Sequence, residues 1–195
     1  MEGTISSKED TNTSIDLTQI TIRPIEDSDA DDLMVWSSDE EVTKFCTWEP
    51  YTSKQNAIDF INKVPTTFTW YKAICLQNRA IGSISLCLCP PEDRFRAKTG
   101  EIGYILGRRF WNKGIVTEVL KKVSKAVFGE YPHLERLEAL TDLENVGSQR
   151  VLEKAGFVKE GVLRNYMFIK GRSRNVVVFS LLPSDLETQV ASLSL

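Results

Sequence analysis

The sequence predicts an α/β domain of the mixed α+β type, because segments with strand periodicity and segments with helix periodicity follow one another along the chain. Residues 101–106 alternate apolar side chains with other side chains, as expected of a strand. Residues 113–128 repeat apolar residues with a helical period, which indicates a helix with one buried face. Only a short loop joins this strand to this helix, so both kinds of element belong to one unit.

Hydrophobic patterns and turn residues place the other elements. Pro24 ends the first strand, the polar pair Gln77–Asn78 joins two strands, and Gly171 lies in the last hairpin. In chain order we expect a strand at 17–23, helices at 27–36 and from about 53, strands at 66–76, 79–88 and 101–106, a helix from about 113, a strand at 134–140, a helix capped by Asn145, and strands at 158–170 and 174–182.

The chain is expected to form a single domain. Residues 1–16 are small and polar without periodicity, which predicts a flexible N-terminal tail. The periodic elements occupy residues 17–186, and residues 187–195 are predicted to be a C-terminal tail. A length of 195 residues, 42% of them hydrophobic, is sufficient for one sizeable core.

Composition excludes several classes of protein. The net charge of -3 and the isoelectric point near 5.4 argue against a general nucleic-acid binder, whose affinity requires a positive surface. No apolar run approaches the roughly 20 residues of a membrane helix, and no signal peptide is recognisable. We therefore expect a cytoplasmic protein, with the nucleus as an alternative, and neither a nucleic-acid nor a membrane partner. Four cysteines, read as reduced, and one histidine are a poor supply of zinc ligands, so no metal site is expected.

The loop at 107–114 has the chemistry of an anion site. Arg108, Arg109 and Lys113 supply positive charge, and Gly114 lets a ligand approach the backbone. The first N–H groups of the following helix have no intrahelical partner, and the helix dipole adds partial positive charge. An ordinary strand-to-helix connection with solvated cations is the alternative. The phosphate-binding fingerprints of nucleotide-binding modules do not occur in this loop.

Two segments carry a family resemblance. The stretch EIGYIL from Glu101, followed by WNKGIVTEV from Trp111, resembles the acetyl-coenzyme A signature of the GNAT N-acetyltransferase superfamily, in the branch of ribosomal-protein N-terminal (alanine/serine) acetyltransferases. Its core motif [QR]-x-x-G-x-[GA] falls on Trp111, Gly114 and Val116, and only Gly114 matches strictly. The resemblance implies a GNAT fold, with a central mixed, mainly antiparallel sheet of about seven strands and helices on both faces.

The second segment begins at Asn145. Asn145 suits a helix cap, and Ser148 shares a helical stripe with Leu152 and Ala155, so its hydroxyl either lies among core residues or takes part in capping. The segment is similar to the superfamily's N-x-x-S-x-x-x-L-x-K-x-G-F helix at every quoted position. The resemblance implies that Asn145 contacts the coenzyme arm and that Ser148 is a candidate general acid.

The resemblance also implies a complete site. The implied coenzyme-binding residues are Ile105, Leu106, Arg109, Trp111, Asn112, Lys113, Gly114, Ile115, Val116, Asn145, Arg150 and Lys154. Backbone N–H groups near Ile105 or Leu106, where the family's central strand is bulged, would polarise the acetyl carbonyl. Glu101 is the candidate base, and Tyr166 is a second candidate for the general acid or the acceptor pocket. Trp48, Glu49 and Tyr51 are expected in the acceptor wall, with packing or solvent exposure as the alternative.

The function implied is direct transfer of an acetyl group from acetyl-CoA to a primary amine, either a small molecule or a protein N-terminus, without a metal. A noncatalytic CoA-binding or regulatory protein of the same fold is the alternative, because Trp111, Val116 and Asn175 depart from the family pattern. The acceptor amine and the oligomeric state are not predicted by any residue pattern in the chain.

Overall fold

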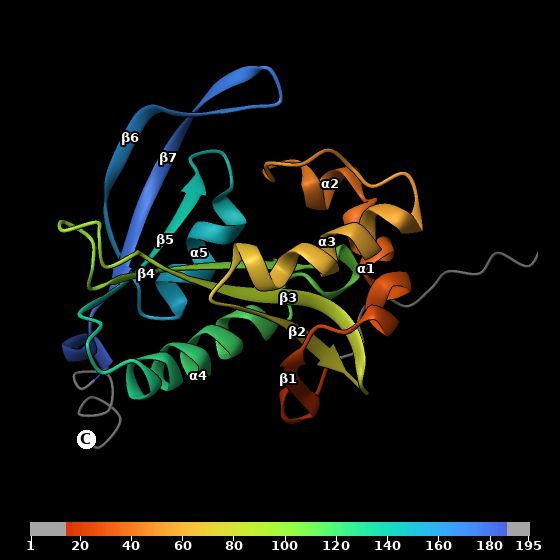
Figure 1. The fold of residues 1–195 in the computed structure, drawn as a ribbon, viewed down its shortest axis with the longest axis horizontal. Coiled ribbons are helices and arrows are strands. Elements are labelled where there is room, and N and C mark those ends of the chain that lie inside the picture. The colour runs from red at the N-terminus through yellow and green to blue at the C-terminus, as the bar shows by residue number, and fades with distance from the viewer. Residues whose placement is uncertain (1–14, 187–195) are drawn as a thin grey trace, which may run out of the picture.

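A computed structural model describes residues 15–186 as an α/β unit built on one sheet (Figure 1). Three short 3-10 turns, η1 to η3, accompany the longer elements. The bounds are η1 Leu17–Gln19, β1 Ile20–Pro24, η2 Asp27–Asp29, α1 Ala30–Ser37, α2 Glu40–Thr43, α3 Lys54–Thr67, β2 Trp70–Leu76, β3 Arg79–Leu88, β4 Thr99–Leu106, η3 Arg108–Phe110, α4 Ile115–Glu130, β5 Arg136–Asp142, α5 Val146–Lys154, β6 Val158–Ile169 and β7 Arg172–Leu181.

The sheet confirms the predicted class. Its seven strands follow the order β1-β2-β3-β4-β5-β7-β6, and β4 with β5 is the parallel pair while the other neighbours are antiparallel. Helices α4 and α5 cover one face, and α1 and α3 cover the other (Figure 1). Two apolar clusters fill the layers, one around Leu120, Leu137 and Phe179, the other around Leu33 and Trp36. Burial of these side chains is the main driving force for the layered arrangement.

Several boundaries differ from the prediction. Helix α3 continues through Pro65 to Thr67, so β2 begins at Trp70 rather than at residue 66. Proline removes one backbone donor, but it lies in the last turn, where Phe68 N still donates to Val64 O at 3.1 Å. Helix α4 begins at Ile115 rather than 113, because Gly114 has a φ of 76° and is the N-cap.

The predicted tails lie mostly outside the described residues. Residues 187–195 are not described, and of residues 1–16 the structure describes Ile15 and Asp16. Ile15 packs against the core, and Asp16 Oδ1 accepts a hydrogen bond from Thr18 N at 2.9 Å. This cap turns residues 17–19 into η1, so β1 begins at Ile20 rather than at Leu17.

Strands β4 and β5 diverge, and their divergence positions the candidate site. They pair only from Thr99 to Glu101, opposite residues 136–138. The bulge expected in β4 is not seen opposite β3, because the register from Gly82↔Leu106 to Leu88↔Gly100 is continuous. Because β4 pairs with β5 only as far as Glu101, the backbone N–H and C=O groups of β4 that point away from β3 have no partner strand from Ile102 onward. This opening is bordered by the end of β4 and the start of α5.

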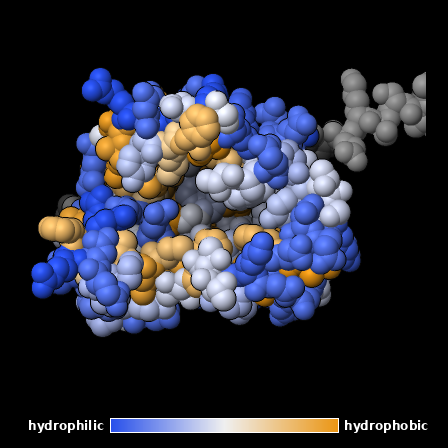
Figure 2. Space-filling model, turned by 45° about the horizontal axis from the view of Figure 1, so that its top comes forward, coloured by the Kyte–Doolittle hydropathy of each residue, from blue (hydrophilic) through white to orange (hydrophobic). Residues whose placement is uncertain are grey.

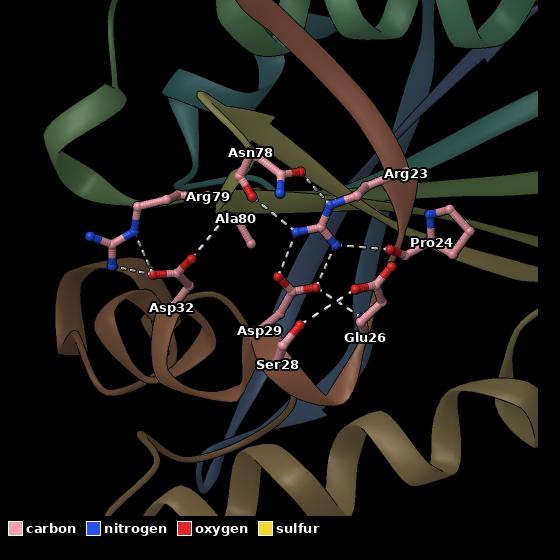
Figure 3. Close-up of polar contacts among 9 residues, drawn as sticks. All are labelled: Arg23, Pro24, Glu26, Ser28, Asp29, Asp32, Asn78, Arg79 and Ala80. Carbon is pink, nitrogen blue, oxygen red and sulfur yellow. Dashed lines mark hydrogen bonds and ion pairs between the residues drawn. The ribbon is translucent and has the colours of Figure 1, made fainter.

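An ion-pair cluster holds the N-terminal part against the sheet (Figure 3). The Arg23 guanidinium donates two hydrogen bonds of 2.7 Å to the Asp29 carboxylate and one of 3.0 Å to Asn78 O. Asp32 accepts from Arg79 and, at 3.1 Å, from Ala80 N. The cluster thus joins β1, the start of α1 and the β2–β3 turn, which fixes α1 over the sheet face on which Glu101 lies.

Candidate active site

The open end of β4 leads into an anion-receptive helix start. Gly114 needs its left-handed φ of 76°, and a Cβ there would meet only Leu17 Cδ1, at 3.9 Å. Asn112 is also left-handed, with a φ of 60°. Glu118 N is the first donor to close a helical hydrogen bond, to Gly114 O at 3.1 Å, so the N–H groups of residues 115–117 stay available. This open backbone surface fits a diphosphate, which binds through main-chain N–H groups and the helix dipole.

The loop before α4 is fixed to the end of β4. Trp111 Nε1 donates to Leu106 O at 2.7 Å, and Arg108 pairs with Asp39 at 2.9 Å. Arg109 and Asn112 are exposed, Lys113 is half-buried and Ile115 is buried. The two departures from the family motif therefore have structural explanations. Trp111 anchors the loop to the end of β4. Val116 is 6% exposed and packs in the core on the buried side of α4.

Asn145 begins α5 as predicted. Its Oδ1 accepts a hydrogen bond from Ser148 N at 3.1 Å. The Ser148 hydroxyl does not cap the helix, because its oxygen lies 2.7 Å from the Tyr104 hydroxyl oxygen across the β4–β5 opening. Burial raises the pKa of Tyr104 well above its ordinary value, although the hydrogen bond with Ser148 opposes this. Tyr104 is therefore a neutral hydroxyl at physiological pH, and the pair holds a proton at the opening.

Glu101 lies on the other face of β4. Residues alternate in side along a strand, so Glu101 faces away from α4 and α5 while Tyr104 faces them. The Glu101 side chain is exposed, yet its pKa is raised, first by partial burial and then by the neighbouring Glu138 carboxylate, with Arg96 acting in the opposite direction. A carboxylate with a raised pKa is a better proton acceptor than an ordinary one.

One of the three predicted acceptor residues, Glu49, meets the β6–β7 hairpin. Lys170, at the hairpin tip, donates to Thr43 O at 3.0 Å and pairs with Glu49 at 3.6 Å. Trp48 Nε1 is buried and has no hydrogen-bond partner among residues 15–186. Tyr51 packs on the α1–α3 cluster, and burial, followed by the nearby Cys46, raises its pKa. Glu49 thus lies where α2 and the hairpin approach each other, and Tyr51 belongs to the packing of α1 and α3.

This approach leaves a hollow surface. Figure 2 shows a depression near the centre of this side of the molecule, with apolar residues along parts of its rim. A cavity of about 230 Å³ lies beside Tyr51 and Phe60. A more open hollow of about 740 Å³ lies at the other end of β4, around Thr99 and Arg136, away from the β4–β5 opening.

Comparison with known proteins decides the family. A family model described as an acetyltransferase (GNAT) domain matches residues 19–158. The chain belongs to the GNAT acetyltransferase family. An uncharacterized N-acetyltransferase, p20 of Bacillus licheniformis, is 34% identical over 170 residues, which cover 84% of this chain and 93% of that protein. The GNAT fold is thereby confirmed, and the chain is an N-acetyltransferase by family.

Solved structures agree with this assignment. A GNAT-family acetyltransferase from Bacillus anthracis superposes with a TM-score of 0.74 at 25% identity, covering 84% of this chain and 95% of that one. RimL, a ribosomal L7/L12 α-N-protein acetyltransferase solved with coenzyme A, superposes with a TM-score of 0.72 at 19% identity, covering 85% of this chain and 94% of RimL. At that identity the likeness to RimL shows a shared fold.

The remaining predicted residues of this GNAT acetyltransferase have diverse positions. Arg150 and Lys154 are exposed on α5. Tyr166 is 52% exposed on β6, and within residues 15–186 its hydroxyl has no hydrogen-bond partner, whereas Ser148 has Tyr104. Asn175 has a structural role, because its Oδ1 accepts from Asn165 N at 2.8 Å where β6 departs from the β7 register.

Sequence reasoning misses two residues of this GNAT site. The alternation of residues along the strand places Tyr104 on its buried face but does not predict its contact with Ser148. No motif in the sequence points to Glu138. The register reveals both: Glu138 is opposite Glu101, and residue 104 reaches α5 because β4 and β5 separate. A charged residue at an inward position of a buried strand is the one available signal for Glu138. Among the described residues, no helix could span a membrane and no three acidic, Cys or His side chains gather as metal ligands.

Proposed function

We propose that this N-acetyltransferase moves an acetyl group from acetyl-CoA directly to a primary amine. The observation that carries the proposal is the continuity of one surface. The open N–H groups at residues 115–117 lead, by a loop anchored through Trp111 to Leu106, into the β4–β5 opening. Ser148 borders that opening on one face of the sheet and Glu101 lies on the other. Acetyl-CoA supplies a thioester, whose carbonyl carbon accepts the amine nitrogen as the carbon–sulfur bond breaks.

Each step has a candidate group in this chain. Backbone N–H groups of 115–117 hold the diphosphate, and an N–H at Ile105 or Leu106 that points away from β3 stabilises the developing negative charge on the carbonyl oxygen. Glu101 takes the proton that the amine nitrogen loses, and Ser148 gives its hydroxyl proton to the leaving sulfur. Glu101 and Tyr104 are three residues apart, about 10 Å along the strand, so in this proposal the proton passes from the nitrogen to Glu101 through water rather than by direct contact.

The base favours a particular acceptor. An α-amine has a pKa near 8 and a lysine amine one near 10.4, so deprotonating lysine at neutral pH costs roughly 3 kcal/mol more. A carboxylate is a weak base. The raised pKa of Glu101 brings it only part of the way toward the pKa of an amine, so the amine that loses its proton more easily is favoured. The proposed acceptor is therefore a protein or peptide N-terminus.

Calorimetry with acetyl-CoA, CoA, ATP and NAD tests the donor. Acetyl-CoA and CoA are expected to bind with similar affinity, because the diphosphate and not the acetyl group supplies most of the contacts. Binding of ATP or NAD without binding of CoA would overturn the proposal.

An acetylation screen tests the acceptor. Peptides with free N-termini, the same peptides blocked at the N-terminus but carrying lysine, polyamines and small amines are incubated with acetyl-CoA, and a mass increase of one acetyl group is measured. Peptides with free N-termini are expected to react fastest. Glu101→Gln is expected to lower turnover with acetyl-CoA binding intact, and Ser148→Ala to do the same. Unchanged turnover in either variant would remove that residue from its role.

A further inference from the structure

A row of polar side chains crosses the sheet beneath the candidate acceptor site. The strand registers align Cys87 with Glu101, Glu101 with Glu138, and Glu138 with Ser180. Residues aligned across neighbouring strands project from the same face of a sheet. Leu137 and Phe179, adjacent in sequence to this row, belong to the α4 cluster on the other face. The Glu101 and Glu138 carboxyl groups are therefore neighbours on adjacent strands.

Glu138 is held in place by cations. Its residue is 8% exposed, and its carboxylate pairs with Arg96 and, at 3.4 Å, with Arg136. Arg136 in turn pairs with Glu160 at 2.6 Å, and Ser180 Oγ donates to Glu160 at 2.7 Å. A buried carboxylate that pairs with two guanidinium groups has little freedom to turn away. Glu138 thus presents a fixed negative charge next to Glu101.

Glu101 differs from Glu138 because no ion pair or hydrogen bond engages its carboxylate within residues 15–186, and the residue is exposed. Arg96 comes from the loop before β4, and its electrostatic neighbours include Glu138, Glu101 and Tyr166. Several titratable and charged groups act on Glu101 itself, on Glu138 or on Arg96. They are Cys87, Cys89, Arg96, Arg136, Glu138 and Tyr166. The two cysteines are neutral, because burial raises their pKa values.

We propose that Glu138 and Arg96 are positioning residues that set the proton affinity of Glu101 in opposite directions. The inference rests on the proposed role of Glu101 as the base. The Glu138 carboxylate disfavours a second negative charge beside it, so Glu101 retains its proton to a higher pH. Arg96 pairs with Glu138, and its positive charge also acts on Glu101, so it offsets part of that repulsion. The balance makes Glu101 a stronger base than an isolated carboxylate.

Carboxyl carbon NMR of the free protein tests the coupling directly. The Glu101 resonance is assigned by its loss in Glu101→Gln and is then followed against pH. Glu138→Gln is expected to move the Glu101 midpoint down by about 0.5–1 pH unit, because the repelling charge is gone and the cations remain. Arg96→Gln is expected to move it up by a similar amount. The two variants break the same ion pair, so a purely structural role predicts shifts of the same sign or none, and either result would overturn the proposal.

Glu135→Gln is the matched control. Glu135 pairs with Lys98 near the same end of β4, but both side chains are more than 60% exposed and neither lies in the polar row. The Glu101 midpoint is expected to stay unchanged in this variant. If Glu138→Gln lowers stability too far for titration, Arg96→Gln alone decides, since Arg96 is 43% exposed on a loop and its loss must raise the midpoint.

The same variants separate this inference from the proposed function. The acid limb of kcat/KM against pH is expected to shift down in Glu138→Gln and up in Arg96→Gln, following the NMR midpoint. Opposite NMR shifts combined with full turnover of Glu101→Gln would keep the electrostatic coupling but reject Glu101 as the base. Opposite NMR shifts without any movement of the kinetic limb would reject the positioning role in catalysis.

Discussion

The Tyr104 hydroxyl lies 2.7 Å from the Ser148 hydroxyl, and the contact joins β4 to the first turn of α5 across the opening between β4 and β5. Tyr104 also lies 3.2 Å from Ser148 O. Because burial keeps Tyr104 protonated, it can donate to Ser148 Oγ and leave the serine proton free to reach a sulfur in the opening. The tyrosine then replaces the proton that the serine gives away.

Tyr104→Phe tests this arrangement. The variant keeps the ring that packs against the core and removes only the hydroxyl. We expect kcat to fall about tenfold, a part of the hundredfold or more that a positioned proton donor supplies, with the Kd for CoA unchanged. Turnover measured by free thiol release, alongside calorimetry with CoA, gives both values.

Tyr71→Phe provides a matched control. Tyr71 is buried and its hydroxyl lies 2.5 Å from Ser83 Oγ, so it forms the same kind of pair on the opposite face of the sheet. Each phenylalanine variant should lose about 1 kcal/mol of unfolding free energy for the missing hydrogen bond. Only Tyr104→Phe should lower kcat. Equal kinetic losses in both would mean that the Tyr104 effect is merely structural.

Gly114→Ala tests the helix start as the coenzyme site. A non-glycine residue in the left-handed region costs about 1–2 kcal/mol, so alanine favours a different backbone at this helix start and shifts the N–H groups of 115–117, although its methyl group would meet only Leu17 Cδ1, at 3.9 Å. We expect weaker CoA binding by at least about tenfold, since 1.4 kcal/mol corresponds to that factor, measured by calorimetry.

Gly129→Ala is the control within the same helix. A methyl group added at Gly129 would meet no heavy atom within 4 Å, and the φ of this residue is not left-handed. Alanine there should raise the unfolding free energy by about 0.5–1 kcal/mol and leave CoA affinity unchanged. A loss of CoA affinity in both glycine variants would argue against a local effect at Gly114.

The sequence predicts those parts of the fold that depend on local pattern. Alternation identifies β4, helical spacing identifies α4, and Asn145 marks the start of α5 correctly. Local pattern fails at Pro65, where propensity favours ending the helix but tertiary packing of α3 extends it. Local pattern also does not say how deeply a strand is buried: helices on both faces of the sheet bury residues of β3 such as Ser83 and Ile84.

Contacts between distant segments are beyond local pattern. Tyr104 and Ser148 are 44 residues apart in the sequence, and Lys170 and Thr43 are 127 residues apart. Each pair comes into contact only in the assembled fold. Glu101 can be chosen from its position in the family motif, but its neighbour Glu138 depends on the register of two parallel strands joined through α4. The coenzyme side of the site is built from consecutive residues and is therefore easier to predict than the acceptor side.

The Arg23–Asp29 pair predicts a specific dependence of stability on pH. Burial acts to raise the pKa of Asp29, but hydrogen bonds from Arg23 and Glu26 N outweigh it, so the pKa lies below its ordinary value. A lowered folded-state pKa stabilises the protein above the unfolded value of about 3.9, and this contribution is lost as the pH falls through the folded value. Asp29→Asn should therefore show a flatter decline of unfolding free energy between about pH 5 and pH 3 in urea titrations.

At pH 7, Asp29→Ala should lower the unfolding free energy by about 3–5 kcal/mol, because it leaves a partly buried guanidinium unpaired. The neighbouring Arg79–Asp32 pair gives the control (Figure 3). Arg79 is 74% exposed, so Arg79→Ala should cost only about 0–1 kcal/mol. A comparable loss in both variants would mean that burial does not distinguish the two ion pairs.

Lys170→Met tests whether the contact between the hairpin tip and α2 shapes the acceptor site. Lys170 is 20% exposed and hydrogen bonds to Thr43 O, so methionine keeps the side-chain length but releases the hairpin from α2. We expect a higher KM for the acceptor, by about threefold to tenfold for one lost charged hydrogen bond, with CoA affinity unchanged. Glu49→Gln should have a smaller effect, because Glu49 is 75% exposed and 3.6 Å from Lys170. If Lys170→Met instead weakened CoA binding and left the acceptor KM unchanged, the hairpin would belong to the coenzyme side, contrary to its contact with Thr43 and Glu49.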